Sequence, residues 1–158
     1  MDQLDINEAI HEVIALTRGE MTHSRVTLST HLAEVGPIHG DRVQLQQVIL
    51  LILNAIEAMR DNEPRDLLIE SAENDGRNII VSVSDSGSGV DPATVDRIFE
   101  PFYSTKEGGV GIGLSICRSI IEAHEGKIWA LQNNASGSTF QFTLPVATTR
   151  VEASGRSQ

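Results

Sequence analysis

The sequence has few of the residues that would hold a fold together other than by its apolar core. Its 158 residues contain one cysteine, one tryptophan and 4% aromatic residues in all. A single thiol excludes an intrachain disulfide and a thiolate metal cluster. Cys117 lies within "LSICRSII", where a small buried apolar side chain is favoured over a reactive thiol.

Basic residues are also scarce, with 12 Lys and Arg against 22 Asp and Glu, for a formal net charge of −10. Broad contact with nucleic acid or an anionic membrane requires clustered basic residues, so we expect neither as a direct partner. No apolar run reaches the roughly 18 residues of a membrane span, and the N-terminus lacks a signal-peptide pattern. These absences predict a globular domain of cytoplasmic location.

Helical spacing of apolar residues predicts several helices. The first covers 4–21, a short one covers "PATVDRIF" at 92–99, and another runs from about Gly113 to His124. A long helix is expected from Asp41, and we predict that it is unbroken. Its apolar positions are Leu45, Val48, Ile49, Ile52, Ile56 and Met59.

Alternating apolar and polar residues predict strands over 25–32, 67–74, 78–85, 127–133 and 138–145. This grouping indicates an α+β two-layer sandwich, a mixed sheet of about five strands covered on one face by about three helices. We expect one domain over 1–145 and a flexible tail over 146–158, whose composition is typical of a linker.

The first candidate site residue is Asp85, which ends a predicted strand and begins "DSGSGV". A carboxylate fixed at a strand end can accept a hydrogen bond from an exocyclic amine such as that of adenine. Gly87 and Gly89 permit backbone turns that a Cβ would hinder. The alternative is a plain turn between a strand and a helix.

A second candidate is Asn54, one helical turn before Glu57 on an otherwise apolar helix. An amide oxygen is a reasonable Mg²⁺ ligand. A lone Asn inside a helix is, however, more often a residue that makes local hydrogen bonds.

A third candidate is the stretch "GGVGIGLSI" at 108–116, where Gly109, Gly111 and Gly113 directly precede a predicted helix. The free N–H groups of a helix N-terminus favour anions, so a phosphate ligand is indicated. Neither the P-loop pattern nor the dinucleotide fingerprint GxGxxG is present.

Taken in order, Asn54, "DSGSGV", "IFEPFYSTK" and "GVGIGLSI" resemble the N, G1, F and G2 boxes of the sensor histidine kinase ATP-binding domain. That domain belongs to a superfamily shared with gyrase, the MutL repair proteins and a heat-shock chaperone. The resemblance covers roughly residues 5 to 145, and it implies the Bergerat-type ATP-binding fold with the nucleotide under a mobile lid.

The resemblance also implies roles for individual residues. Asp85 would hold the adenine amine, Gly87 and Gly89 would admit the base, and Asn54 would bind Mg²⁺. The catalytic set would be Asn54, Glu57 and Lys106, with the lysine adding positive charge beside the phosphates. Without the resemblance, Lys106 would be interpreted as a solvated surface charge. The remaining phosphate contacts would come from Gly109, Val110, Gly111, Ile112, Gly113 and Leu114.

The aromatic stretch before the predicted lid contains Phe99, Pro101, Phe102 and Tyr103. By the resemblance it would form a lid base that contacts a partner helix. A small satellite core is an equally good interpretation.

The sequence departs from the family pattern in several places. Leu50 stands where the superfamily's ATPases have a Glu that activates water, which disfavours hydrolysis and leaves transfer to another nucleophile open. The stretch before Asn54 is one residue shorter, which puts metal affinity in doubt. Val110 replaces a common hydroxyl residue, and Glu125 replaces a common Gly.

The phosphoacceptor is not expected in this chain. The family's acceptor His is followed by an acid and, soon after, by a basic residue and a Pro. Here His11 is followed by the acid Glu12, but the basic residue and the Pro are missing. His11 is therefore interpreted as an ordinary helix residue.

The resulting hypothesis is the ATP-binding catalytic domain of a two-component sensor histidine kinase. With ATP and Mg²⁺ it would transfer the γ-phosphoryl group to a His on a separate dimerisation and phosphotransfer domain of the same full-length kinase, which then serves a response regulator. The isolated domain is expected to be monomeric. The alternatives are an ATPase of the same superfamily, or a degenerate nucleotide-sensing or protein-binding module.

Overall fold

The structure is a computed structural model that describes residues 2–61, 63–87, 98–99, 113–133 and 137–147. The predicted short helix at 92–99 lies almost entirely outside the described residues.

A five-stranded sheet forms one layer of the molecule, in the order β2-β4-β5-β7-β6. Its strands are β2 (Thr27–Leu32), β4 (Asp66–Asn74), β5 (Asn78–Asp85), β6 (Lys127–Gln132) and β7 (Ser138–Pro145). β2 is parallel to β4, and every other pairing is antiparallel, so the sheet is mixed.

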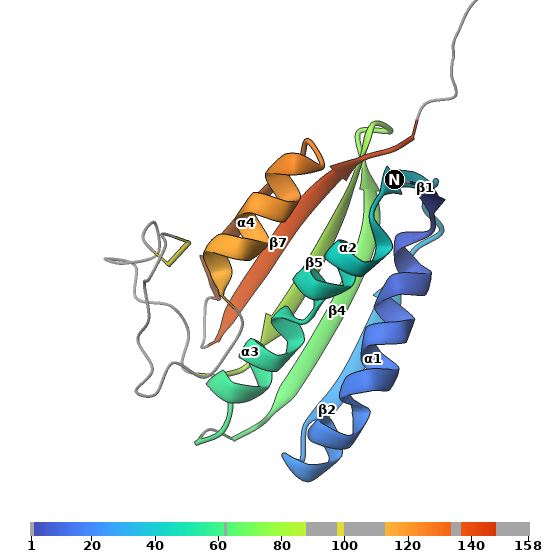
Figure 1. The fold of residues 1–158 in the computed structure, drawn as a ribbon. Coiled ribbons are helices and arrows are strands. Elements are labelled where there is room, and N and C mark those ends of the chain that lie inside the picture. The colour runs from blue at the N-terminus through green and yellow to red at the C-terminus, as the bar shows by residue number, and fades with distance from the viewer. Residues whose placement is uncertain (1, 62, 88–97, 100–112, 134–136, 148–158) are drawn as a thin grey trace, which may run out of the picture.

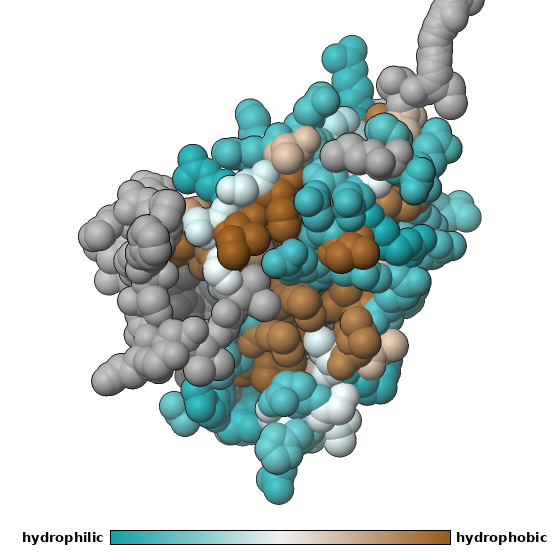
Figure 2. All heavy atoms as spheres, viewed as in Figure 1, coloured by the Kyte–Doolittle hydropathy of each residue, from teal (hydrophilic) through white to brown (hydrophobic). Residues whose placement is uncertain are grey.

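The second layer consists of helices that cover one face of this sheet (Figure 1). They are α1 (Ile6–His23), α2 (Arg42–Ile49), α3 (Leu51–Ala58) and α4 (Leu114–Ala123). The predicted α+β two-layer sandwich is therefore confirmed. Apolar side chains reach the surface over α2, α3 and α4 (Figure 2), among them the half-exposed Ile116.

The first two helices begin at aspartate caps. The side chain of Asp5 accepts a hydrogen bond from the backbone N–H of Asn7 at 2.8 Å, and Asp41 accepts one from Gln44 at 3.0 Å. Each carboxylate satisfies an N–H group that the helix itself leaves without a partner, which defines where the helix starts.

The prediction of one unbroken helix after Asp41 is wrong, because the chain breaks at Leu50 between α2 and α3. The N–H of Leu53 donates to the carbonyl of Leu50 at 2.8 Å, three residues back, which is a tightened turn. Residues 48–53 are all apolar, so the periodicity contains no polar position that could reveal such a break. The six predicted apolar positions are nevertheless all buried.

A small second sheet was not predicted. β1 (Asp2–Leu4) pairs antiparallel with β3 (Ile38–Gly40), and both strands are too short to give a period-two pattern. The chain stays hydrogen-bonded two residues past the expected domain end at 145. Val146 donates to the carbonyl of Arg77 at 2.8 Å, and Ala147 to that of Pro37 at 2.7 Å.

The core lies between the sheet and the helices. Its largest fully buried side chains come from both layers and include Ile6, Ile10, Leu45, Ile52, Met59, Ile69, Ile79 and Phe142.

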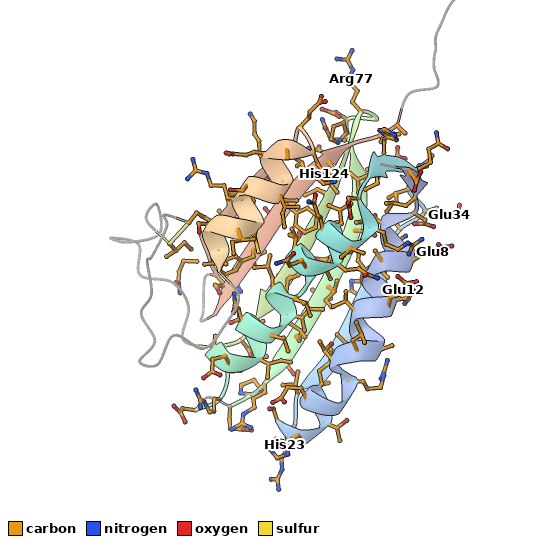
Figure 3. All side chains as sticks on the ribbon, in the orientation of Figure 1. Glu8, Glu12, His23, Glu34, Arg77 and His124 are labelled. Carbon is orange, nitrogen blue, oxygen red and sulfur yellow. The ribbon has the colours of Figure 1, made fainter. Side chains whose placement is uncertain are left out.

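His124 joins two helix ends at the edge of this core (Figure 3). Its Nδ1 donates to the carbonyl of Ile120 at 2.8 Å, and its Nε2 accepts from the N–H of Asp41 at 3.0 Å. This assignment ties the end of α4 to the start of α2. A Cβ on Gly40 would lie 2.8 Å from the His124 ring, so glycine is required there.

Candidate functional site

The candidate site is centred on Asp85, the last residue of β5. The residue is only 4% exposed, and its side chain lies on the helix side of the sheet, in the row that contains Leu67. Its Oδ1 accepts a hydrogen bond from the N–H of Gly87 at 2.8 Å, and its Oδ2 accepts one from Oγ of Ser138 at 3.0 Å. The carboxylate is thus held in one orientation by the protein itself.

Two opposing influences act on the protonation of this carboxyl group. Burial raises the pKa of Asp85, and the hydrogen bonds from Gly87 and Ser138 lower it, with burial the larger effect. The net pKa lies above the usual aspartate value.

The carboxylate also retains room for a further donor. A carboxylate has about four acceptor positions. Among the described residues, Gly87 uses one and Ser138 uses two, the second through its N–H at 3.4 Å from Oδ1. Relative to these residues, one position on Oδ2 is left, and a hydrogen-bond donor such as an exocyclic amine is the kind of group that it can accept.

Ser138 and its neighbours at the start of β7 were missed in the sequence. Asn133 donates from Nδ2 to the backbone carbonyl of Asp85 at 3.2 Å and accepts from Oγ1 of Thr139 at 2.8 Å. Gly137 has φ +93, and a Cβ there would come 2.0 Å from the Asp85 carbonyl. The available signal was a glycine followed by two hydroxyl residues, but only the pairing of β7 with β5 brings it to Asp85.

Gly87 has a steric role that the sequence did not indicate. A Cβ at this position would lie 2.4 Å from the carbonyl oxygen of Ala58, in the last turn of α3. No side chain fits between these two backbones. The close approach fixes the end of β5 against the helix that carries the predicted metal ligand.

That helix, α3, carries Asn54 and Glu57 one turn apart. Asn54 is half-buried, and α3 packs directly on β5. Glu57 forms an ion pair with Arg60 and is 26% exposed in its side chain. The fold thus brings the helix of Asn54 beside the strand of Asp85, and the roles of Asn54 in metal binding and of Glu57 in catalysis stay predictions.

The other predicted end of the site is the start of α4. Gly113 is the N-cap residue, with φ −69 and no side-chain cap, and Leu114 is the first helical residue. Among the described residues, a Cβ on Gly113 would meet only the flexible Ile116 side chain, at 3.4 Å. Within that part of the chain, neither crowding nor a left-handed backbone requires glycine here.

The remaining predicted contacts lie outside the described residues. They are Gly89, Lys106, Gly109, Val110, Gly111 and Ile112, together with Pro101, Phe102 and Tyr103 of the aromatic stretch.

Phe99 and Cys117 are both packed in the interior. Phe99 is 7% exposed and meets Phe140 edge to face, with ring centroids 6.1 Å apart. Cys117 is fully buried, and burial raises the pKa of its thiol to about 11, which confirms the apolar interpretation of this residue.

Comparisons with known proteins agree with this geometry. The family model described as histidine kinase-, DNA gyrase B-, and HSP90-like ATPase matches residues 40–148. The sensor protein FixL of Bradyrhizobium diazoefficiens is 48% identical over 109 residues, 68% of this chain and 22% of FixL. The sensor protein TdiS of Thauera aromatica is 37% identical over 147 residues, 90% of this chain and 27% of TdiS.

Among solved structures, the catalytic domain of histidine kinase ThkA has a TM-score of 0.81 at 35% identity and covers 91% of this chain and 94% of that domain. The chain belongs to the family of histidine kinase-, DNA gyrase B- and HSP90-like ATPases, and its fold is that of histidine kinase catalytic domains. It spans about a quarter of the length of the sensor proteins FixL and TdiS. In the part of the chain that the structure describes, no helix combines the length and apolarity that crossing a membrane requires.

Proposed function

We propose that this chain is the ATP-binding catalytic part of a two-component sensor histidine kinase. It binds Mg²⁺ and ATP and delivers the γ-phosphoryl group to a histidine on a separate dimerisation domain. The observation that carries the proposal is the buried Asp85 carboxylate. Gly87 and Ser138 orient it and leave one of its acceptor positions unused, and it lies in a fold that is shared with histidine kinase catalytic domains.

Asp85 selects the base by accepting a hydrogen bond from its exocyclic amine. A hydrogen bond to a charged group contributes about 1.5 to 3 kcal/mol. Because Ser138 and Gly87 already hold the carboxylate, little ordering is required when the ligand arrives. The same bonds keep the group ionised more readily than burial alone would allow.

The phosphate end of the proposed site begins at the start of α4. The start of α4 has no side-chain cap, whereas α1 and α2 are capped by aspartates that would repel a phosphate. Lys106 and the backbone from Gly109 to Leu114 contact the phosphates in this proposal, and Asn54 holds Mg²⁺ through its amide oxygen. When bound, Mg²⁺ and ATP supply the transferable phosphoryl group and the charge that balances it.

Leu50 favours transfer over hydrolysis. Its side chain is apolar and packs against the core, so it can neither accept a proton from water nor orient one. The kinase is therefore preferred over the ATPase alternative, and the oriented carboxylate argues against a module that only binds protein.

The proposed partners are the dimerisation and phosphotransfer domain of the same kinase and a response regulator. In support, FixL and TdiS are sensor proteins, and ThkA has a structure in complex with the response regulator TrrA, with a TM-score of 0.78 at 33% identity over 92% of this chain and 41% of ThkA. A cytoplasmic location follows from the same role.

The test is phosphotransfer in trans. The chain is mixed with γ-labelled ATP, Mg²⁺ and the dimerisation domain of its full-length kinase, and the label is followed. We expect an acid-labile label on a histidine of the dimerisation domain, and strongly reduced labelling with Asp85→Asn when ATP is kept near the wild-type Kd. Release of inorganic phosphate without protein label would indicate the ATPase, and nucleotide binding with neither product would indicate a sensing module.

A further inference from the structure

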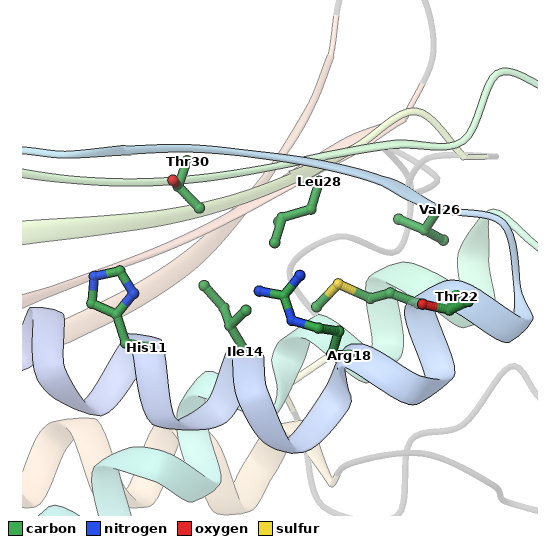
Figure 4. A pocket seen from close by; sticks show the side chains of 8 residues that line it. His11, Ile14, Arg18, Thr22, Val26, Leu28 and Thr30 are labelled. Carbon is green, nitrogen blue, oxygen red and sulfur yellow. The ribbon is translucent and has the colours of Figure 1, made fainter.

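A groove lies between α1 and β2, two elements that come earlier in the sequence than the residues of the candidate site. It has a volume of about 410 Å³ and an apolar floor, with His11 and Arg18 reaching into it from α1 (Figure 4). The apolar floor consists of Ile14, Met21, Val26 and Leu28. We call it the α1–β2 groove.

β2 is an edge strand of the main sheet, and no other described strand pairs with its outer side. The N–H groups of Thr27 and Ala33 donate to carbonyls of the β4 side, at 2.9 and 3.0 Å. Because hydrogen-bonding groups alternate along a strand, the even-numbered residues Leu28, Thr30 and Leu32 direct their backbone N–H and C=O groups outward.

The side chains of those residues lie on the helix side of the sheet, since Leu28 aligns with the buried Leu67. Leu28 and Thr30 consequently line the α1–β2 groove with their side chains while offering free backbone groups at the sheet edge. An extended chain that paired with β2 would place every second side chain over the groove.

The charges of the groove are unlike those of the chain as a whole. Arg18 and His11 are exposed and make no hydrogen bond or ion pair with any other described residue. The acidic residues Glu8 and Glu12 of α1 (Figure 3) form ion pairs with Arg42 of α2, at 3.3 and 2.8 Å. In a chain of net charge −10, the groove therefore has a positive charge, that of Arg18, and no acidic residue in its lining.

We infer that the α1–β2 groove and the edge of β2 bind an extended segment of another polypeptide that carries apolar and carboxylate side chains on one face. The segment adds a strand to β2, its backbone bonding to Leu28, Thr30 and Leu32, an apolar side chain covering the groove floor, and a carboxylate pairing with Arg18. A second copy of this chain does not fit, because the same basic side chains would then face each other.

The probe is a short synthetic peptide with both ends blocked. Threonine occupies every second position, and the positions between the threonines are valine, glutamate and valine in that order. A control peptide has lysine in place of glutamate. Backbone amide shifts and hydrogen exchange of the whole chain are followed by NMR. We expect the glutamate peptide to shift the amides of Leu28, Thr30 and Leu32 and slow their exchange, and the lysine peptide to have at least roughly tenfold lower affinity.

Two substitutions separate the charge from the backbone contribution. Arg18→Glu should weaken the glutamate peptide by roughly tenfold or more, whereas Arg77→Glu, the same charge change at the exposed β4–β5 turn, should not. Thr30→Pro removes an outward N–H without touching the β4 ladder and should abolish binding, whereas Thr30→Ala should retain it.

The inference is overturned if wild type does not bind the glutamate peptide up to millimolar concentration, if both peptides bind equally, or if folded Thr30→Pro, verified by its thermal transition, binds normally. A dimer formed through β2 would also overturn it. Asp85→Asn should bind the peptide like wild type, so this test does not depend on the proposed nucleotide site.

Discussion

The two ends of the candidate site differ in how much of them the protein completes by itself. At the end of β5, Asp85 is buried and oriented by Gly87 and Ser138, and glycine is required by contact with α3. At the start of α4, Gly113 has no side-chain cap, and its contacts with the described residues give no steric reason for glycine. In the proposed site, the protein itself orients the carboxylate that would select the base, whereas the described part of the phosphate end is only the start of α4.

The largest expected effect comes from adding a methyl group at Gly87, compared with the same change at Gly113. Gly87→Ala places Cβ 2.4 Å from a backbone oxygen of α3, so the strand end and the helix must separate. We expect a loss of about 2 to 3 kcal/mol in the free energy of unfolding, measured in urea, together with loss of nucleotide binding. Gly113→Ala is the matched control, and its unfolding should stay within about 0.5 kcal/mol of wild type. Equal costs at both positions would remove the distinction between the two ends.

Asp85→Asn tests the base-selecting end without changing its shape. It replaces an acceptor by a donor at the remaining position and removes a buried charge, so nucleotide affinity should fall by about 1.5 to 3 kcal/mol while the fold persists. Titration calorimetry with Mg²⁺ and ADP measures the first effect and thermal unfolding the second. Wild-type affinity in this variant would show that the carboxylate does not contact the base.

Acidity should affect nucleotide binding through the same group. Because the pKa of Asp85 is raised in the folded chain, its own contribution to stability is present at low pH and lost as pH rises through that value. Nucleotide binding, which needs the ionised form, should instead weaken as pH falls, at a pH above the ordinary aspartate value of about 3.9. Fluorescence titration across pH measures the midpoint.

Ser138→Ala sharpens that test. The variant loses a hydrogen bond that lowers the pKa of Asp85, so the midpoint of the pH dependence should move upward. At neutral pH the affinity should fall only modestly, by about 1 kcal/mol. A downward movement of the midpoint would contradict the assigned role of Ser138.

The smallest effect concerns a position where the backbone favours glycine and the sequence lacks it. Glu125 follows α4 with φ 66, a left-handed conformation that costs an ordinary residue energy. Glu125→Gly should stabilise the chain by about 0.5 to 1 kcal/mol, after allowance for the greater freedom of glycine in the unfolded state. Unfolding in urea gives the value, and a destabilised variant would show that the Glu125 side chain has a role not found in the structure.

The sequence predicted what depends on local pattern. The five strands and the helices around Leu45 and Ile121 follow from periodicity, and Asp85 was identified because it ends a strand beside two glycines. The break at Leu50 was not predictable, because a continuous run of apolar residues has no alternation with polar residues that would show where one helix ends and the next begins.

Contacts between distant segments were not predictable either. Ser138 reaches Asp85 only because β7 pairs with β5 in a particular register, and no single-sequence pattern gives that register. The steric need for Gly87 arises from Ala58, almost thirty positions earlier in the chain. Both residues depend on tertiary structure, which local motifs do not specify.

The most direct test of the central claim is a crystal structure of the chain with Mg²⁺ and a non-hydrolysable ATP analogue. We predict that the exocyclic amine of adenine lies about 3 Å from Oδ2 of Asp85, in the position that Gly87 and Ser138 leave available. A nucleotide bound with its base elsewhere, or an unchanged Asp85 surrounded only by water, would contradict it.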